Sequence, residues 1–251
     1  MKTWKMKPAR DLGLSEEERQ LSVNRESGLF SGVVRLFWWT LVKLYLRVVH
    51  RLSVRGRGNL PHETPFVVIA NHASHLDVFI LASQLRATIR ASIFPIAAGD
   101  TFFETRSARR FATLLLNALP MWRRNCGRHA MNDLRERLVD GTSAFVLFPE
   151  GTRTRSGAIG RFRPGIGMLV AETDIPIIPC WIEGAHRALP PKRSLPRPTR
   201  LRLVIGEPIR FPHIPNQRDG WDQIAAECFA AVEALAGRGS KRGLQSTPMA
   251  Q

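Results

Sequence analysis

A histidine and an aspartate that follow a short apolar segment are the first residues of this chain that could carry out chemistry. His72 and Asp77 lie five residues apart, directly after the apolar run 66–70. A neutral histidine can accept a proton from an alcohol, and a nearby carboxylate can orient its ring and stabilise the cation that forms. Positions five apart on a regular helix point about 140° away from each other. The pair can therefore meet if His72 lies on a turn and Asp77 in the first turns of the following helix, and Asn71 and Ser74 suit such a turn.

Two other interpretations of this segment stay open. His72 and His75 could be turn residues without a role, or both could join Asp77 as metal ligands, since all three are ligand types. The downstream histidines are scattered and isolated: His129, His186 and His213. Because no further cluster with ligand spacing is present, the sequence predicts no metal site.

A second turn, again after an apolar run, could bind an anion. Glu150, Gly151, Thr152 and Arg153 follow the run 143–148. The glycine permits close backbone approach, the threonine adds a hydroxyl donor, and the guanidinium suits phosphate oxygens. The glutamate could accept hydrogen bonds from a polyol or hold the arginine in place. Each turn alone is more often an ordinary surface turn, but together they indicate acyl or phosphoryl transfer.

The overall charge indicates an anionic partner. The chain has 251 residues, enough for one substantial core, and 37 basic against 21 acidic residues give it a net charge of +16 and a pI of about 11.3. Such a surface attracts nucleic acid, anionic lipid headgroups or an acidic carrier protein, and charge alone does not choose among them. The three cysteines are far apart and odd in number, which fits no disulfide framework and indicates a reducing compartment.

The region before the first apolar run predicts a helix that lies on a membrane surface. Residues 1–28 form a polar tail without the apolar part of a secretory signal, and no uncharged run is long enough for a conventional membrane span. Within the predicted helix 29–57, the cationic residues of 29–52 fall within one arc of about 160° on a helical wheel, and the remaining arc is apolar and contains Trp38. The cationic arc consists of Arg35, Lys43, Arg47, His50 and Arg51. This pattern is typical of a cationic amphipathic interfacial helix, with a helix packed on the domain core as the alternative.

Apolar runs alternate with helix-compatible segments through the rest of the chain. Buried strands are expected at 66–70, 93–98 and 143–148, a half-exposed strand at 200–205, and helices at 76–87, 104–118, 130–139, 164–173 and 221–236. The run 175–182 contains two prolines, which favour an edge or irregular strand. The sequence therefore predicts a single α/β domain over residues 58–236, with a mixed, largely parallel sheet flanked by helices. The tail 237–251 is expected to be disordered.

The two turns resemble two signature blocks of the glycerolipid acyltransferases, the family that includes the 1-acylglycerol-3-phosphate acyltransferases. His72, four residues and Asp77 are similar to the first block, Asn-His-x-Ser-x-x-Asp, and residues 148–153 match the third, Phe-Pro-Glu-Gly-Thr-Arg, without a mismatch. Residues 175–179 resemble the apolar, proline-containing fourth block, which helps to form the acyl pocket.

The second block of the family is less well matched. Ala118 stands where the family has a glycine, and Arg124, which could also supply a second phosphate contact on chemical grounds, stands at the final arginine. The family's lysine-rich stretch is missing, because residues 97–103 contain no lysine. This departure leaves room for an acceptor other than 1-acylglycerol-3-phosphate. The resemblance covers residues 60–208.

The resemblance implies transfer of a fatty acyl group from acyl-CoA or acyl carrier protein to the hydroxyl of a lysophospholipid, with 1-acylglycerol-3-phosphate giving phosphatidate in phospholipid biosynthesis. It implies that His72 deprotonates the hydroxyl and Asp77 supports it. It assigns binding of the acceptor's phosphate and glycerol to four residues: Arg124, Glu150, Gly151 and Arg153. A thioester has a good leaving group, so no cofactor is expected, although the tetrahedral intermediate needs an oxyanion donor.

These expectations place the protein at the cytoplasmic face of an anionic membrane, with an acyl donor and a lysophospholipid as partners and no nucleic acid. Two other functions compete with this one. A basic lipid- or nucleic-acid-binding module without catalysis is the first, but the sequence lacks the sheet of interleaved aromatic and basic residues that nucleic-acid binding favours. A hydrolase of acyl thioesters, with water in place of the alcohol, is the second.

Overall fold

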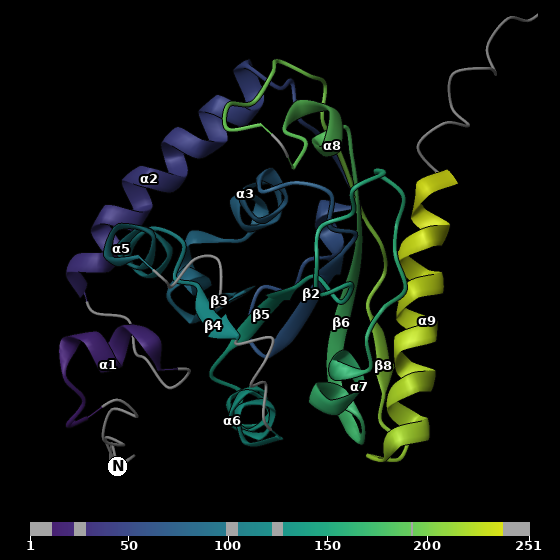
Figure 1. Cartoon of the computed structure of the whole chain (residues 1–251). Helices are drawn as coiled ribbons and strands as arrows, with labels where there is room; N and C mark the ends of the chain where they lie inside the picture. The colour runs from purple at the N-terminus through teal and green to yellow at the C-terminus, as the bar shows by residue number, and fades with distance from the viewer. Residues whose placement is uncertain (1–11, 23–28, 99–104, 122–127, 192, 238–251) are drawn as a thin grey trace, which may run out of the picture.

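A mixed sheet forms the centre of the protein. The computed structural model describes residues 12–22, 29–98, 105–121, 128–191 and 193–237 (Figure 1). In these residues eight strands form one sheet: β1 (Ser53–Arg55), β2 (Phe66–Ala70), β3 (Ile93–Ala98), β4 (Leu119–Met121), β5 (Ala144–Leu147), β6 (Thr173–Glu183), β7 (Arg202–Ile205) and β8 (Ile209–Phe211). The main path runs β1-β7-β6-β2-β5-β3-β4, and β8 pairs with β6.

Most of the pairings in this sheet are parallel. The strands β6, β2, β5, β3 and β4 are parallel to one another, and β1 is parallel to β7. Strands β7 and β8 are antiparallel to β6. The prediction of an α/β fold with a mixed, largely parallel sheet is therefore confirmed. The central strands read as continuous apolar runs because helices cover both of their faces.

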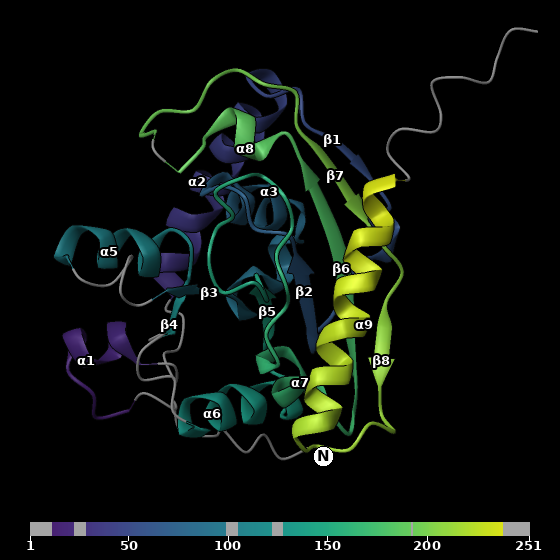
Figure 2. The same cartoon turned by 45° about the vertical axis from the view of Figure 1, so that its right-hand side comes forward.

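The helices divide into two layers, one on each face of the sheet (Figures 1 and 2). One layer contains α2 (Leu29–Val48), α3 (Leu76–Gln84), α5 (Arg106–Leu114) and the short α8 (Ala185–Ala188). The other contains α6 (Arg128–Val139), α7 (Gly165–Val170) and α9 (Arg218–Gly237). β2 shows the division directly, because Phe66, Val68 and Ala70 pack with the first layer and Val67 and Ile69 with the second. Short helices complete the fold: α1 (Glu16–Leu21), and the 3₁₀ turns η1 (Arg57–Asn59) and η2 (Ala87–Ser92).

The run with two prolines, predicted as an edge or irregular strand, is irregular but does not lie at an edge of the sheet. It belongs to β6, which lies between β2 and β7. Pro176 falls in the register shift of the β6–β8 pairing, between Thr173 and Ile177. Pro179 lies between the end of the β8 pairing at Ile177 and the start of the β7 pairing at Cys180. The prolines are tolerated inside the sheet because this side of β6 changes its pairing partner where they occur.

The segment 29–57 is not one amphipathic helix. α2 ends at Val48, and residues 53–55 form β1, so the sheet begins before residue 58. The predicted wheel also misplaces Arg35, which is buried at 4% exposure and donates from Nε to the carbonyl of Leu114. Burial lowers the pKa of this guanidinium to about 10. Packing of α2 on α3 and α5 decides which face is buried, and a wheel drawn from the helix alone cannot include these partners.

Candidate active site

Both predicted turns lie at the same edge of the sheet. β2 and β5 are adjacent and parallel, so the segments that follow their carboxyl ends emerge side by side. The chain then leaves β2 toward α3 on one face and leaves β5 toward α7 on the other face. Adjacent parallel strands whose connections diverge in this way leave a crevice at their carboxyl ends, the usual ligand site of open α/β sheets.

The first turn brings His72 and Asp77 together. His72 Nδ1 lies 3.0 Å from Asp77 Oδ2, and the same oxygen accepts hydrogen bonds from the backbone N–H groups of Ala73 (2.7 Å) and Ser74 (2.8 Å). Asp77 is fully buried in the first turn of α3. An oxygen that accepts two backbone hydrogen bonds is best assigned to an ionised carboxylate, so Nδ1 carries the proton and donates it to Asp77.

This tautomer leaves the other ring nitrogen of His72 able to accept a proton. Nε2 has no hydrogen-bond partner among the residues that the structure describes, and the His72 side chain is 19% exposed. The ring stacks on Phe148, with centroids 4.1 Å apart and planes 17° from parallel. The imidazole is therefore fixed on one face and along one edge, and Nε2 is free to take a proton from a substrate hydroxyl.

The second turn is tied to the first through Glu150. This glutamate is 7% exposed, and its Oε1 accepts a hydrogen bond of 2.7 Å from the backbone N–H of His72. Its Oε2 accepts one of 2.9 Å from the backbone N–H of Gly160. Burial raises the pKa of Glu150, while the two backbone donors and His72 act in the opposite direction. Glu150 thus connects the backbone of the base to the loop after β5.

Gly151 and Arg163 pack closely in the same loop. Gly151 has φ +74°, which an L side chain rarely adopts, and a Cβ at this position would lie 2.8 Å from Arg163 Nε. Arg163 Nε also donates to the carbonyl of Glu150 at 3.2 Å. The glycine at position 151 is therefore required by backbone conformation and by the neighbouring guanidinium.

Arg153 acts electrostatically on His75, three residues after His72. The pKa of His75 falls to about 4, first because the ring is buried and then because Arg153 and His72 lie close to it. The segment is anchored by a hydrogen bond of 2.9 Å from the Thr154 N–H to the carbonyl of His72. Arg153 is thus positioned to hold an anion beside His72, while Thr152 is exposed and lines a cleft next to the turn.

The structure brings most of the predicted site residues together, and Arg124 lies outside the described residues. Phe148, Gly160 and Arg163 were not predicted to contribute. Phe148 was predicted as the end of a strand and the first residue of the third signature block, without a role of its own, and no periodic signal marks the segment that holds Gly160 and Arg163. In the described part of the chain, no group of three or more metal-ligand side chains is arranged to hold an ion.

Comparison with known proteins shows which family the chain is related to. A family model described as Acyltransferase matches residues 51–183, which include both turns. The chain is 26% identical over 196 residues to two chloroplastic 1-acyl-sn-glycerol-3-phosphate acyltransferases, BAT2 of Brassica napus and LPAT1 of Arabidopsis thaliana, with 72% of this chain covered. It covers 53% and 51% of these proteins, so it spans about half the length of these curated relatives.

A solved structure supports the fold. The crystal structure of the 1-acyl-sn-glycerophosphate acyltransferase PlsC from Thermotoga maritima has a TM-score of 0.60 to this chain at 22% sequence identity. The match covers 87% of this chain and 91% of that chain. The similarity therefore extends over the sheet and both helical layers.

Proposed function

This chain belongs to the acyltransferase family, and we propose that it is a membrane-peripheral enzyme that transfers a fatty acyl group from an acyl thioester to a lysophospholipid hydroxyl. The observation that carries the proposal is His72, whose Nδ1 is held by the buried Asp77 while Nε2 has no hydrogen-bond partner among the described residues. The names of the curated relatives favour 1-acylglycerol-3-phosphate as the acceptor, which would give phosphatidate. Either acyl-CoA or acyl carrier protein could supply the acyl group.

The reaction needs one proton acceptor and one anion-binding group near each other. His72 Nε2 takes the proton from the acceptor hydroxyl, whose oxygen then attacks the thioester carbonyl. Asp77 stabilises the imidazolium that forms, and the imidazolium returns the proton to the departing thiolate when the tetrahedral intermediate collapses. Arg153, which acts electrostatically on the neighbouring His75, binds the acceptor's phosphate. Glu150 holds the His72 backbone in place through its hydrogen bond to the N–H group.

Thiol release separates this function from the hydrolase. The purified protein is incubated with a long-chain acyl-CoA, with and without 1-acylglycerol-3-phosphate and other lysophospholipids, and free thiol and lipid product are measured. Thiol release that depends on the acceptor, together with a new diacyl lipid, is expected. Thiol release without an acceptor would indicate a hydrolase. If no thiol were released with any donor or acceptor, a lipid-binding module without catalysis would be the remaining function.

Membrane association is proposed from the exposed side of α2. On this helix the side away from the core carries large apolar residues that are 44–72% exposed: Val33, Leu36, Phe37, Leu41, Leu44 and Val48. Lys43 and Arg47 lie among them and are exposed. No described helix is both long enough and apolar enough to cross a bilayer. An apolar stripe flanked by cations suits a helix that lies in the headgroup region of an anionic membrane, here placed on the cytoplasmic side.

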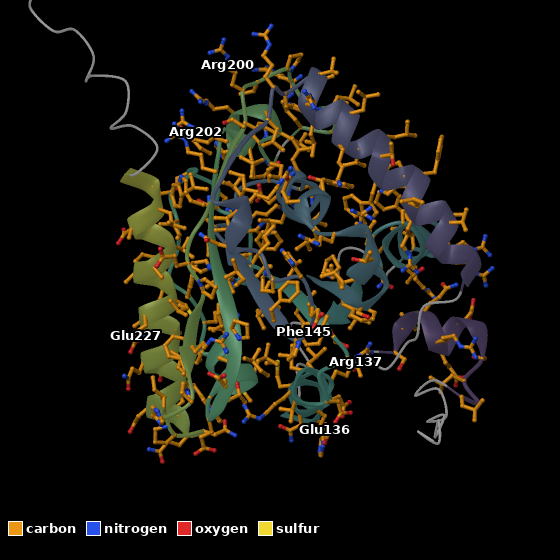
Figure 3. The ribbon with its side chains drawn as sticks, turned by 180° about the vertical axis from the view of Figure 1, so that it is seen from behind. Glu136, Arg137, Phe145, Arg200, Arg202 and Glu227 are labelled. Atoms are coloured by element: carbon orange, nitrogen blue, oxygen red, sulfur yellow. The ribbon has the colours of Figure 1, made fainter. Side chains whose placement is uncertain are left out.

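The loop between α8 and β7 extends this surface. Leu195 is 74% exposed and lies between Arg193 and Arg197, which are also exposed. The loop is joined to the end of α2 by hydrogen bonds from Leu201 N–H to the carbonyl of His50 and between His50 Nδ1 and the carbonyl of Thr199. Figure 3 shows Arg200 near this end of α2.

Sedimentation with vesicles tests the membrane surface. Because Trp39, Val42 and Leu46 of α2 lie in the core, removing the helix would disrupt the fold, so exposed positions are changed instead. Phe37→Ser combined with Leu44→Ser should reduce the fraction bound to anionic vesicles several-fold. Val139→Ser, an exposed valine on α6 in the other layer, is the matched control. Equal binding of the double variant and the control would contradict the proposal.

A further inference from the structure

A cleft beside the second turn has no role in the mechanism described above. It has a volume of about 510 Å³ and lies between the loop that follows β5 and the first turns of α9. Three arginines line it, Arg161 and Arg163 from the loop and Arg218 from the helix, together with Thr152, Thr154 and Asp222. A cavity of this size with three guanidinium groups is suited to a small molecule that carries several anionic groups.

The carboxylates of the cleft are already paired. Asp222 Oδ2 accepts a hydrogen bond of 2.9 Å from Arg218 Nε. Glu150, which also lines the cleft, accepts from the backbone N–H groups of His72 and Gly160. Arg163 Nε donates a hydrogen bond to the carbonyl of Glu150. Arg161, which also lines the cleft, has no ion pair or hydrogen bond in the described part of the chain. Terminal N–H groups on all three arginines are therefore available to an anion.

The position of the cleft limits what the anion can be. Phe162, between Arg161 and Arg163, packs in the core layer of α6, α7 and α9, whereas α2 with its apolar stripe covers the opposite face of the sheet (Figures 1 and 2). If α2 lies on the membrane, α9 and the part of the loop around Phe162, which line the cleft, lie on the face of the sheet away from the lipid. A ligand of the cleft is then a water-soluble anion rather than a membrane headgroup.

The cleft also adjoins the catalytic turn. Glu150 is the shared residue, because it lines the cleft and accepts the hydrogen bond from the backbone of His72. Of the two proposed substrates, only the acyl donor has a part that is both water-soluble and rich in phosphate. In acyl-CoA that part is the nucleotide, which carries a diphosphate and a sugar phosphate at the end of the molecule remote from the acyl chain.

We propose that this cleft binds the phosphates of the CoA nucleotide while the thioester lies at His72. The proposal rests on the proposed function, since it assigns the donor side of the same reaction. Arg161 and Arg218 are the specific contacts. Arg163 contributes charge but also packs against Gly151 and Glu150, so its substitution would disturb the turn as well.

Direct binding of CoA tests the proposal without requiring turnover. Arg161→Gln combined with Arg218→Gln should raise the Kd for CoA, measured by calorimetry, about tenfold or more, because each lost contact is charge-assisted. Pantetheine, which lacks the nucleotide, should bind the double variant and the unchanged protein equally. Arg210→Gln is the matched control, since Arg210 is also an exposed arginine paired with an aspartate, Asp174, but lies on β8 outside the cleft.

Kinetics with three acyl donors give a second readout. The double variant should show a KM for acyl-CoA raised by a similar factor, with kcat and the KM for the lysophospholipid within about twofold of the unchanged protein. With an acyl-pantetheine thioester as the donor, the two proteins should not differ. With acyl carrier protein as the donor, which has no nucleotide, a much smaller effect is expected.

Several results would overturn the assignment of the cleft to CoA. An unchanged Kd for CoA, or an equal loss with acyl-pantetheine or acyl carrier protein, would exclude the nucleotide as the ligand. A raised KM for the lysophospholipid alone would assign the cleft to the acceptor headgroup. Tight CoA binding that depends on the two arginines, without any acyl transfer, would instead refute the proposed function and keep the binding site.

Discussion

The two turns of the site differ in how they are held. The turn after β2 is closed by local contacts, since one oxygen of Asp77 accepts from His72 and from the two residues that follow it. The turn after β5 is held by contacts over longer separations: Glu150 reaches His72 and Gly160, and Arg163 reaches back to Glu150. The first turn thus fixes the tautomer and orientation of the His72 ring, and the second holds the backbone of His72 in place.

This difference predicts that substitutions in the two turns reduce activity in two different ways. A change in the first turn should alter the protonation chemistry with little effect on the rest of the molecule. A change in the second should loosen the fold around the site and reduce activity as a consequence. Measuring kcat together with stability separates the two cases.

The largest effect is expected from Asp77→Asn. The amide oxygen can still accept the two backbone hydrogen bonds, so the turn should keep its shape, but the imidazolium loses the charge that stabilises it. We expect kcat to fall by roughly 10²–10⁴-fold. The thermal midpoint should fall less than in Glu150→Gln, because the backbone hydrogen bonds of the turn are kept and the NH₂ group replaces an oxygen, Oδ1, that already has no hydrogen-bond partner in the described structure.

His72→Ala and Asp174→Asn complete this comparison. His72→Ala should remove nearly all activity, since no other base lies at the same place. Asp174→Asn, which breaks only the exposed ion pair with Arg210, should retain full activity. If Asp77→Asn were as active as this control, the histidine would not work through the carboxylate.

A smaller loss of activity, with a larger loss of stability, is expected from Glu150→Gln. The amide would place an N–H donor against one of the two backbone donors that Glu150 now satisfies. An unsatisfied buried donor costs about 1–3 kcal/mol, which should appear in the free energy of unfolding measured with urea. Activity should fall about 10- to 100-fold through displacement of His72.

The same variant tests how the resemblance assigns Glu150. If this carboxylate mainly bound the acceptor's glycerol, Glu150→Gln would raise the KM for the acceptor and leave the free energy of unfolding unchanged. Glu183→Gln serves as the control, since Glu183 is an exposed glutamate at the end of β6 that pairs with Arg202.

The sequence predicts the first turn better than the second for a physical reason. His72 and Asp77 meet through local geometry, a strand followed by a turn and a helix, which their spacing already encodes. The apolar runs of β2, β3 and β5 are recognisable for a similar reason, because strands covered on both faces are continuously apolar.

Contacts between distant segments could not be predicted in this way. Nothing in the spacing of Glu150 and Gly160 indicates that one carboxylate would accept hydrogen bonds from Gly160 and from a residue on another strand connection. The buried Arg35 and the interior position of β6 are missed for the same reason, since each depends on neighbours that only the folded chain brings together.

The smallest effect is expected from His75, in the first turn, and it depends on pH. The pKa of His75 is lowered to about 4 in the folded protein from an ordinary value of 6.5. Between these values the unfolded chain binds more protons than the folded chain, so the free energy of unfolding decreases as the pH falls from about 7 toward 4. His75→Gln removes this group and should therefore make the stability less dependent on pH over that range, a difference visible in urea midpoints at about pH 7 and about pH 5.

His62→Gln, at an exposed histidine, is the control. If His75→Gln and the unchanged protein lose the same stability between the two pH values, His75 is not held neutral beside Arg153, and the cation of the second turn does not act on the first.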